Sequence, residues 1–421
     1  MKSIRKLEFI LLLITYFSVS TFLNFYLSIE VIQWIVYGFF IYYLLVASRN
    51  LQVNGEQERT KTFNWILIFY TTFVFLSFLR GIFFYAGDYW TYKASFTNLM
   101  ALSIPFFTYV YANPIFLSRV LGTWFKWAPL LILLLFFAGF RLVNFQWAIG
   151  PFFMIGIFFS LMAQKWKFIF LLAFLLCFFE FDARSQLIKG IITALIAFFI
   201  YIDHYFSLRR LKFIYFGLVF IPIFLLILGI TGIFNVFELD AYIDSADIAG
   251  FQKEDENLLA DTRTGLYSEV ISSAVNNDYI LFGRSLARGN DSELFGLELN
   301  SLVTQNGLAE RSSNEMALPT IFTWTGIVGL FLYTFLFLSS GYYAIFRSKN
   351  RYVPYMGIYI LIYWAYSWVE NPVDFNLSNI CIWFSIGMCV SFQFRMMTDL
   401  QFKGWLNSIF SGRRLNFFHT Q

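Results

Sequence analysis

The chain has little charge for its length. Of its 421 residues only 13% are charged, whereas 59% are hydrophobic and 22% are aromatic. A soluble domain carries about 25% charged residues, so a water-soluble globular fold is excluded. The 57 phenylalanines would make a water-exposed chain aggregate, and the composition therefore indicates a membrane protein.

Histidine and cysteine are scarce, with two and three residues respectively. The cysteines, Cys177, Cys381 and Cys389, all fall in apolar stretches and have no metal-binding spacing. His204 is expected on the cytoplasmic side and His419 in the tail. The sequence also lacks a Gly-rich phosphate loop, a His/Glu metal pair and a nucleophile-elbow serine. These absences argue against a nucleotide-driven pump and a zinc enzyme, and we expect no metal and no cofactor.

Long apolar runs dominate the chain instead. A bilayer core about 30 Å thick needs roughly 17–25 apolar residues per helix, and lipid forces the backbone to satisfy its own hydrogen bonds. We therefore expect an all-α, polytopic membrane fold. The expected spans, about twelve, are 7–26, 29–47, 63–84, 96–112, 124–140, 148–163, 167–181, 186–202, 213–234, 318–346, 353–370 and 378–397. The first run stays apolar to Tyr26, which favours an uncleaved helix over a signal peptide.

Basic residues set the expected orientation. With the N-terminus inside, the inner loops and the two termini hold 20 of the 30 Lys and Arg residues. Cytoplasmic loops are enriched in Lys and Arg, so both termini are expected in the cytoplasm. The chain then divides into membrane helices over 1–234, an outer loop over 235–317, membrane helices over 318–397 and a cytoplasmic tail over 398–421.

The outer loop is polar and acidic. It holds 15 of the 26 acidic residues and 5 of the 30 basic ones, a formal charge of −10. A large loop on one side of a scaffold is a common place for function. We expect this extracytoplasmic loop to carry the active site, in the periplasm if the cell is Gram-negative.

Three cations are expected at the outer ends of membrane helices. Arg80 lies near the end of the third span, and Arg184 and Lys189 flank the start of the eighth. Ionisable groups at membrane depth are costly and indicate function, although long side chains also extend to lipid headgroups. Ser185 and the helix N-terminus add donors for an anion beside Arg184. Both interpretations stay open for all three cations.

The outer loop contains further candidates. Arg263 opens a stretch with apolar residues at helical spacing over 266–274, and Arg284 ends an apolar run. Either arginine could equally form a surface ion pair. At the exit of the loop, Glu310 and Glu315 are candidate general bases. Ser312 and Glu315 also have the spacing of a capping box, which is a purely structural alternative.

The order of these motifs resembles the O-antigen ligase and polymerase superfamily, the Wzy-like and WaaL-like bacterial membrane proteins. Residues 183–186 stand where that family has a Ser-Arg-Gly-like motif, and 262–267 and 280–284 where it has an Arg-containing helix and a Leu-Leu-Gly-like turn. Residues 313–315 match its exit, followed by Gly326 and Gly329, a pair that also serves close helix packing. The similarity covers roughly 180–340. Family ligases have a histidine in this loop and this chain has none, which favours a polymerase.

The resemblance implies a glycosyltransferase that polymerises lipid-diphosphate-linked repeat units into surface polysaccharide at the outer face of the bacterial inner membrane. It implies an undecaprenyl-diphosphate-linked oligosaccharide as substrate. Membrane lipid, chain-length regulators and flippases are the implied partners, and nucleic acid is not one. Cations would stabilise the leaving diphosphate while a carboxylate takes the acceptor's proton. The expected diphosphate ligands are Arg80, Arg184, Lys189, Arg263 and Arg284, and the expected bases are Glu315 and Glu310. An O-antigen ligase and a lipid-linked oligosaccharide flippase remain alternatives.

Overall fold

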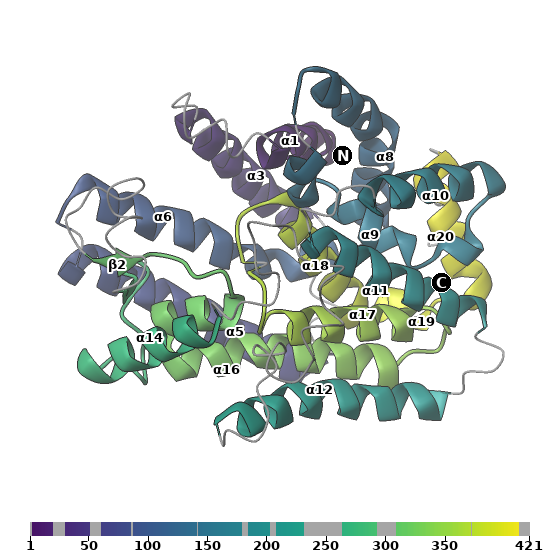
Figure 1. Ribbon diagram of the computed structural model, residues 1–421. Coiled ribbons are helices and arrows are strands. Elements are labelled where there is room, and N and C mark those ends of the chain that lie inside the picture. The colour runs from purple at the N-terminus through teal and green to yellow at the C-terminus, as the bar shows by residue number, and fades with distance from the viewer. Residues whose placement is uncertain are drawn as a thin grey trace, which may run out of the picture.

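The computed structural model is built almost entirely of α-helices (Figure 1). It describes residues 2–19, 30–50, 60–85, 87–140, 142–178, 184–202, 208–230, 263–292, 309–371 and 373–411. The first part contains α1 (Lys2–Val19), α3 (Glu30–Asn50), α5 (Lys61–Arg80), the π-helix η2 (Gly81–Tyr85), α6 (Tyr89–Ser103), η3 (Ile104–Phe107), α7 (Thr108–Tyr111), α8 (Pro114–Phe137), η4 (Leu142–Trp147), α9 (Gly150–Gly156), η5 (Phe159–Leu161) and α10 (Gln164–Phe178). The second part contains α11 (Arg184–Tyr201), α12 (Leu208–Ile230), α14 (Arg263–Asn276), β1 (Asn290–Asp291), β2 (Glu310–Arg311), α16 (Ala317–Phe346), α17 (Val353–Tyr366), α18 (Leu377–Val390), α19 (Phe392–Met396) and α20 (Asp399–Ser411). The expected all-α class is confirmed.

Among the residues that the structure describes, four helices are long and apolar enough to cross a membrane. They are Val31–Arg49 in α3, Lys61–Tyr85 in α5 with η2, Pro114–Phe137 in α8 and Ala317–Phe346 in α16. Shorter apolar helices over Leu187–Tyr201, Val353–Tyr366 and Leu377–Val390 accompany them. Several phenylalanines point outward, as lipid-facing residues do, among them Phe69 and Phe75 on α5 and Phe213 and Phe220 on α12. The helices thus indicate a multi-pass membrane protein, but the twelve expected spans are not shown.

Two of the expected spans are broken. Over 96–112, α6 ends at Ser103 and Pro105 lies in the first turn of η3, because proline has no N–H to continue the α-helical ladder. Over 148–163, α9 and η5 replace one continuous helix. α6 begins early instead, where Asp88 accepts a hydrogen bond from the Thr91 N–H at 2.9 Å and caps the helix.

The core lies where α16, α17 and α18 pack together. α16 runs beside α5 and α17, and α18 is buried along nearly all of its length (Figure 1). A helix that is apolar on every side belongs in the interior. Trp364 of α17 and Trp383 of α18 are among the largest fully buried side chains. This core holds the ends of α16, α17 and α18 in place, and the polar residues described below lie at those ends.

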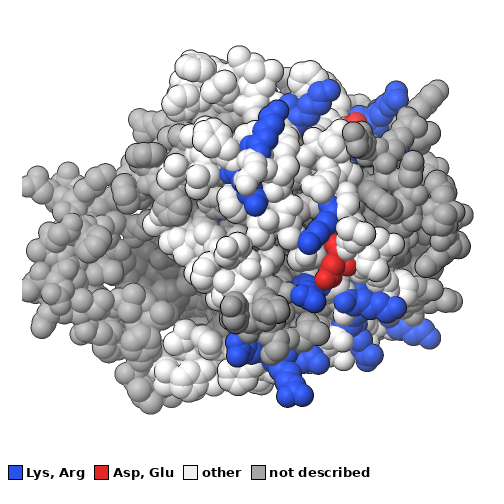
Figure 2. Space-filling view, turned by 90° about the vertical axis from the view of Figure 1, so that its right-hand side faces the viewer, with Lys and Arg blue, Asp and Glu red and all other residues white. Residues whose placement is uncertain are grey.

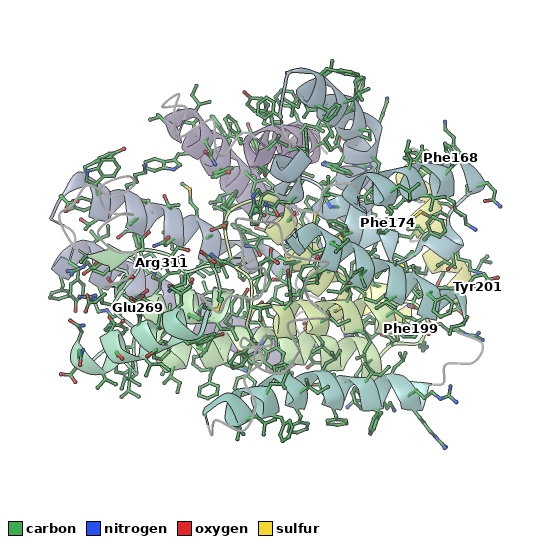
Figure 3. The ribbon with its side chains drawn as sticks, in the orientation of Figure 1. Phe168, Phe174, Phe199, Tyr201, Glu269 and Arg311 are labelled. Atoms are coloured by element: carbon green, nitrogen blue, oxygen red, sulfur yellow. The ribbon has the colours of Figure 1, made fainter. Side chains whose placement is uncertain are left out.

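The two ends of the helical bundle differ in charge. Figure 2 shows Lys and Arg gathered at the end where α10, α12 and α17 begin and α16 ends. The exposed basic residues of those segments and of α20 are Lys165, Arg209, Arg210, Lys212, Arg347, Lys349, Arg351 and Lys403. We call this the basic end. Phe168 and Tyr201 lie there, whereas Glu269 and Arg311 lie at the opposite end, the loop end, with α14, β1 and β2 (Figure 3).

α16 is interrupted near the loop end. Gly326 adopts φ 65° and ψ −169°, which ends one helical stretch and starts another. The segment 279–284, which follows α14, inserts at this break. The Arg284 N–H donates to the Thr323 carbonyl at 2.7 Å, and two further N–H groups past the break donate to carbonyls of the segment. The segment 279–284 therefore supplies backbone hydrogen bonds that the broken helix α16 lacks.

Gly326 meets a second glycine at the break. Gly283 has φ 71°, and a side chain on either residue would collide with the backbone of the other. The sequence pattern of Gly326 and Gly329 predicted close packing between helices. For Gly326 that interpretation is incomplete, because its main role is a turn with positive φ into which the loop fits.

Candidate functional site

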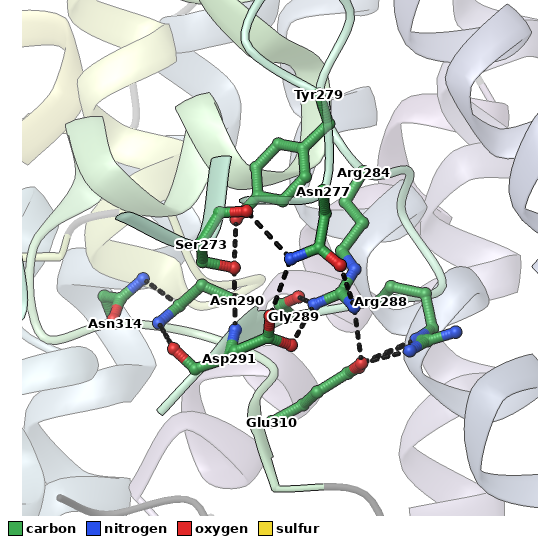
Figure 4. Close-up of polar contacts among 10 residues, drawn as sticks. All are labelled: Ser273, Asn277, Tyr279, Arg284, Arg288, Gly289, Asn290, Asp291, Glu310 and Asn314. Atoms are coloured by element: carbon green, nitrogen blue, oxygen red, sulfur yellow. Dashed lines mark hydrogen bonds and ion pairs between the residues drawn. The ribbon is translucent and has the colours of Figure 1, made fainter. Parts of the chain in front are cut away.

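Two arginines and two carboxylates bind one another at the loop end. This arginine–carboxylate cluster consists of Arg284, Arg288, Asp291 and Glu310 (Figure 4). Arg284 lies 2.6 Å from Asp291 and 3.2 Å from Glu310. Arg288 donates to Glu310 from Nε at 2.8 and 2.9 Å, and also from Nη2. Such charge-assisted pairs are roughly twice as strong as neutral hydrogen bonds.

Backbone pairing brings the two acids of the cluster together. The short β1–β2 ladder places Asp291 opposite Glu310. The Asp291 N–H donates to Ser273 Oγ on α14 at 2.9 Å, and Asn277 Nδ2 donates to the Asp291 carboxylate at 2.6 Å. Arg284 Nη1 donates to the Gly289 carbonyl at 3.0 Å. The end of α14 and the ladder thus hold the cluster as one rigid unit.

The contacts within the cluster shift the pKa values of its members. Burial raises the pKa of Asp291, but hydrogen bonds from Arg284 and Asn277 outweigh burial and hold that pKa below its ordinary value. The hydrogen bond to Glu310 raises the pKa of Arg288 against the effect of burial. Asp291 and Arg288 therefore remain charged at neutral pH.

Arg80 holds the loop segment from the membrane side. It is the last residue of α5, and its Nη2 donates to the carbonyls of Phe282 at 2.8 Å and Gly283 at 2.7 Å. A nearby side chain of α5 adds a second link, because Ser77 Oγ donates to the Trp324 carbonyl of α16 at 2.9 Å. Arg80 thus lies beside the break in α16, directly under the loop that carries Arg284.

Lys189 lies in a second polar group at the start of α11. Its ammonium is 2.7 Å from the Glu370 carboxylate, and the two side chains are 5% and 14% exposed. The ammonium also lies 5.4 Å from the ring centroid of Trp147. Lys189 therefore points into the protein and does not extend to lipid headgroups.

The exit segment, residues 309–316, lies between these two groups. Arg311 of β2 donates from Nε to the Ser313 carbonyl at 3.2 Å, and Asn371 Nδ2 donates to Ser313 Oγ at 3.1 Å. The backbone of Ala317 donates to the Glu370 carbonyl at 3.0 Å. The arginine–carboxylate cluster and the Lys189–Glu370 pair are thus connected through a few hydrogen bonds.

A further carboxylate follows Glu370 in the loop between α17 and α18. The side chain of Asp374 is exposed. Surrounding protein removes much of its hydration and the Glu370 carboxylate lies nearby, and together they raise the pKa of Asp374 to about 6. A carboxyl group with this pKa exchanges protons readily near neutral pH.

Of the residues predicted from the sequence, Arg80, Arg284 and Glu310 come together at the loop end. Glu315 lies on the exit segment next to them, 3.2 Å from Arg311. Lys189 pairs with Glu370 instead. The backbones of Arg184 and Arg263 open α11 and α14, and their side chains lie outside the described residues, as do 231–262 and 293–308 of the outer loop.

Two local predictions can be compared directly. The amphipathic helix over 266–274 is confirmed by α14, where Leu266, Val270 and Ala274 are buried, although Ile271 is exposed. The capping box of Ser312 and Glu315 is wrong. α16 begins at Ala317, its N-cap residue is Met316, and no side chain caps it. Glu315 does not cap the helix, because it lies before the first residue of α16 and a capping box needs its glutamate at the third helical position.

Sequence reasoning did not select Arg288, Glu370 or Asp374 as site residues. The contact of Arg288 is with Glu310, 22 residues away, so no local pattern indicates it. Glu370 and Asp374 had one available signal. Acidic residues are rare outside the large loop, and these two stand together between two apolar runs.

The chain matches no protein-family model, no curated protein and no solved structure, so its family and function have to be argued from its own residues.

Proposed function

We propose that this protein is a membrane glycosyltransferase that joins lipid-diphosphate-linked oligosaccharide repeat units into a surface polysaccharide. The observation that supports it is the assembly of Arg80, Arg284 and Arg288 around one loop segment at the outer end of membrane helices α5 and α16. A lipid carrier presents its diphosphate at the same depth, where the hydrocarbon ends. Cations fixed at that level are in reach of the diphosphate.

The chemistry needs positive charge that is already in position. When the glycosidic bond breaks, the diphosphate leaves with one more negative charge, and preorganised donors stabilise it. Arg284 and Arg288 now bind carboxylates, and phosphate oxygens would replace these with bonds of the same charge-assisted kind. Arg288 is 20% exposed and Arg284 is 11% exposed, so Arg288 is the first to meet the substrate.

Arg80, Arg284 and Arg288 form the proposed diphosphate site, and Arg184, Arg263 and Lys189 remain proposed ligands beside it. Arg184 and Lys189 share α11, so they would approach from the side of the Lys189–Glu370 pair. Glu315 and Glu310 remain proposed bases. Glu310 accepts hydrogen bonds from Arg288 and forms an ion pair with Arg284, so its proton-accepting role requires the substrate to release both arginines first.

The orientation belongs to the same proposal. The basic end carries the exposed Lys and Arg side chains of Figure 2, and positive loops face the cytoplasm. The loop end then faces outward, in the bacterial inner membrane, with both termini in the cytoplasm. Undecaprenyl-diphosphate-linked oligosaccharide is the proposed substrate, and a chain-length regulator and a flippase are the proposed partners in the membrane.

Deletion of the gene in its own host tests the proposal. We expect the ladder of surface glycan on a gel to disappear while a single repeat unit still reaches the surface. Complete loss of surface glycan would contradict polymerisation and indicate a ligase or a flippase. The leaflet that holds the accumulated lipid-linked glycan would then separate these two, because a flippase defect leaves the glycan on the inner leaflet.

Complementation with matched arginine variants tests the site. Arg288→Gln is expected to restore no ladder at normal protein level. Arg351→Gln is the control, since Arg351 also pairs with an aspartate, at 3.4 Å from Asp399, but lies exposed at the basic end. It should restore the full ladder. A full ladder from Arg288→Gln would show that this arginine does not stabilise the leaving diphosphate.

A further inference from the structure

The proposed reaction needs a proton acceptor, and the carboxylates first considered for this role are already bonded. Glu310 accepts hydrogen bonds from Arg288 and lies 3.2 Å from Arg284. Glu315 lies 3.2 Å from Arg311. By contrast, within the described residues the Asp374 carboxylate takes part in no hydrogen bond or ion pair, and its side chain is exposed. Its oxygens are open to an incoming hydroxyl group.

The backbone holds Asp374 rigidly even though its carboxylate is open. The Asp374 carbonyl accepts from the Asn376 N–H at 2.9 Å and from Asn379 Nδ2 at 3.0 Å. Asn376 also caps α18, accepting from the Asn379 N–H at 2.9 Å. On the next position, the ring of Phe375 packs on Tyr37 of α3 with centroids 4.1 Å apart. A group held in this way is preorganised for chemistry.

The groups that face Asp374 set its proton affinity. Glu370 lies in the same loop, Lys189 comes from α11 and pairs with Glu370, and Tyr37 comes from α3. The Glu370 carboxylate, which pairs with Lys189, thus lies near the Asp374 carboxylate. Like charge disfavours ionisation of the unpaired carboxylate. Loss of hydration among the surrounding protein is the larger cause, and together with the charge of Glu370 it raises the pKa of Asp374 to about 6, near the working pH that suits a general base.

Asp374 is also connected to the proposed diphosphate site. Asn371, three residues before it, donates to Ser313, and Ser313 accepts from Arg311 in the strand that carries Glu310. The loop of Asp374 therefore contacts the exit segment through Asn371, and the arginine–carboxylate cluster includes Glu310 of that segment. An acceptor bound at Asp374 and a donor bound at the cluster would meet over that segment.

We infer that Asp374 is the general base of the proposed glycosyl transfer, and that the Lys189–Glu370 pair positions it. The inference rests on the proposed function. The acceptor hydroxyl oxygen attacks the anomeric carbon and forms the new C–O bond, while its proton passes to a carboxylate oxygen of Asp374. The bond between the anomeric carbon and the diphosphate oxygen breaks, and its electron pair leaves on the diphosphate. The proton then passes from Asp374 to water.

The test uses the full-length protein in lipid nanodiscs with lipid-linked oligosaccharide from the deletion strain. Asp374→Asn is expected to slow chain extension by roughly 100-fold or more, the usual contribution of a general base, and to leave donor binding unchanged. Asp399→Asn is the control, because Asp399 is a half-exposed aspartate that pairs with Arg351 at the basic end. It should extend chains at the wild-type rate.

A pH profile gives a readout that a purely structural role would not move. The wild-type rate should fall below a pH of about 6, where Asp374 takes up a proton; this fall is the acidic limb of the profile. Asp374→Glu should retain activity, but its acidic limb should lie at a different pH. If Asp374→Asn fails to fold, the pH profiles of the wild type and of Asp374→Glu still test whether Asp374 is the base. An unchanged limb in Asp374→Glu, or chain extension by Asp374→Asn within threefold of wild type, would overturn the inference. A wild-type protein that extends no chains would overturn the proposed function itself.

Discussion

Gly283 and Gly326 lie backbone against backbone where the segment 279–284 enters the break in α16. Both have positive φ, 71° and 65°, and neither position has room for a Cβ atom. The segment that carries Arg284 and Arg288 can therefore pack directly against α16 because both contact positions are glycine.

Alanine at either glycine should destabilise the protein. The left-handed conformation costs an alanine about 1–2 kcal/mol, and forcing a methyl group into a packed site costs about 1–3 kcal/mol more. Gly38→Ala is the control, since nothing lies within 4 Å of its Cβ position in α3. Thermal unfolding in detergent should show lower midpoints for Gly283→Ala and Gly326→Ala only. Equal midpoints in all three variants would contradict the tight contact.

The Asp291 carboxylate should make stability depend on acid. Its pKa is lower in the folded protein than the ordinary value of 3.8, so its ion pair stabilises the fold above that pH and is lost as the pH falls through the folded pKa. The effect should be modest, because the side chain is 48% exposed and solvent screens the pair. Unfolding midpoints of wild type and Asp291→Asn should converge below a pH of about 3.8 and separate above it.

The Lys189–Glu370 pair should show strong coupling in a double-mutant cycle. Lys189→Met alone leaves a nearly buried carboxylate without its cation, at a cost of about 3–5 kcal/mol. Glu370→Gln in the same chain removes the uncompensated charge and should recover most of that loss. Unfolding by denaturant measures all four proteins. Simple additivity of the two single changes would mean that the pair is not formed in the membrane.

Arg80 should be needed to hold the loop segment. Arg80→Ala removes two hydrogen bonds to carbonyls, each worth about 1.5–3 kcal/mol because the donor is charged. Arg80→Lys keeps the charge but lacks the planar fork, and should rescue only part of the effect. Hydrogen exchange of residues 279–284 should speed up most in Arg80→Ala. Lys165→Ala, an exposed change at the basic end, should leave exchange there as in wild type.

The sequence alone determined the all-α class of this protein and indicated that it belongs in a membrane. Apolar runs and scarce charge are properties of composition, and lipid leaves the backbone little choice but helices. The apolar spacing of α14 was visible in the same way, and so were Arg80, Arg284 and Glu310 as candidates, which the structure brings together at the loop end. Each of these conclusions depends on residues close in sequence or on the solvent around the chain.

Only the tertiary structure decided which charges meet. Arg288 finds Glu310 because a two-residue ladder brings segments 22 positions apart into register, and Lys189 finds Glu370 across 181 positions. No local pattern specifies such a pair, since any of the loop's many carboxylates could have been the partner. The break at Gly326 was hidden for the same reason. A glycine in an apolar run permits both close packing and a turn, and only the segment that packs against it selects one.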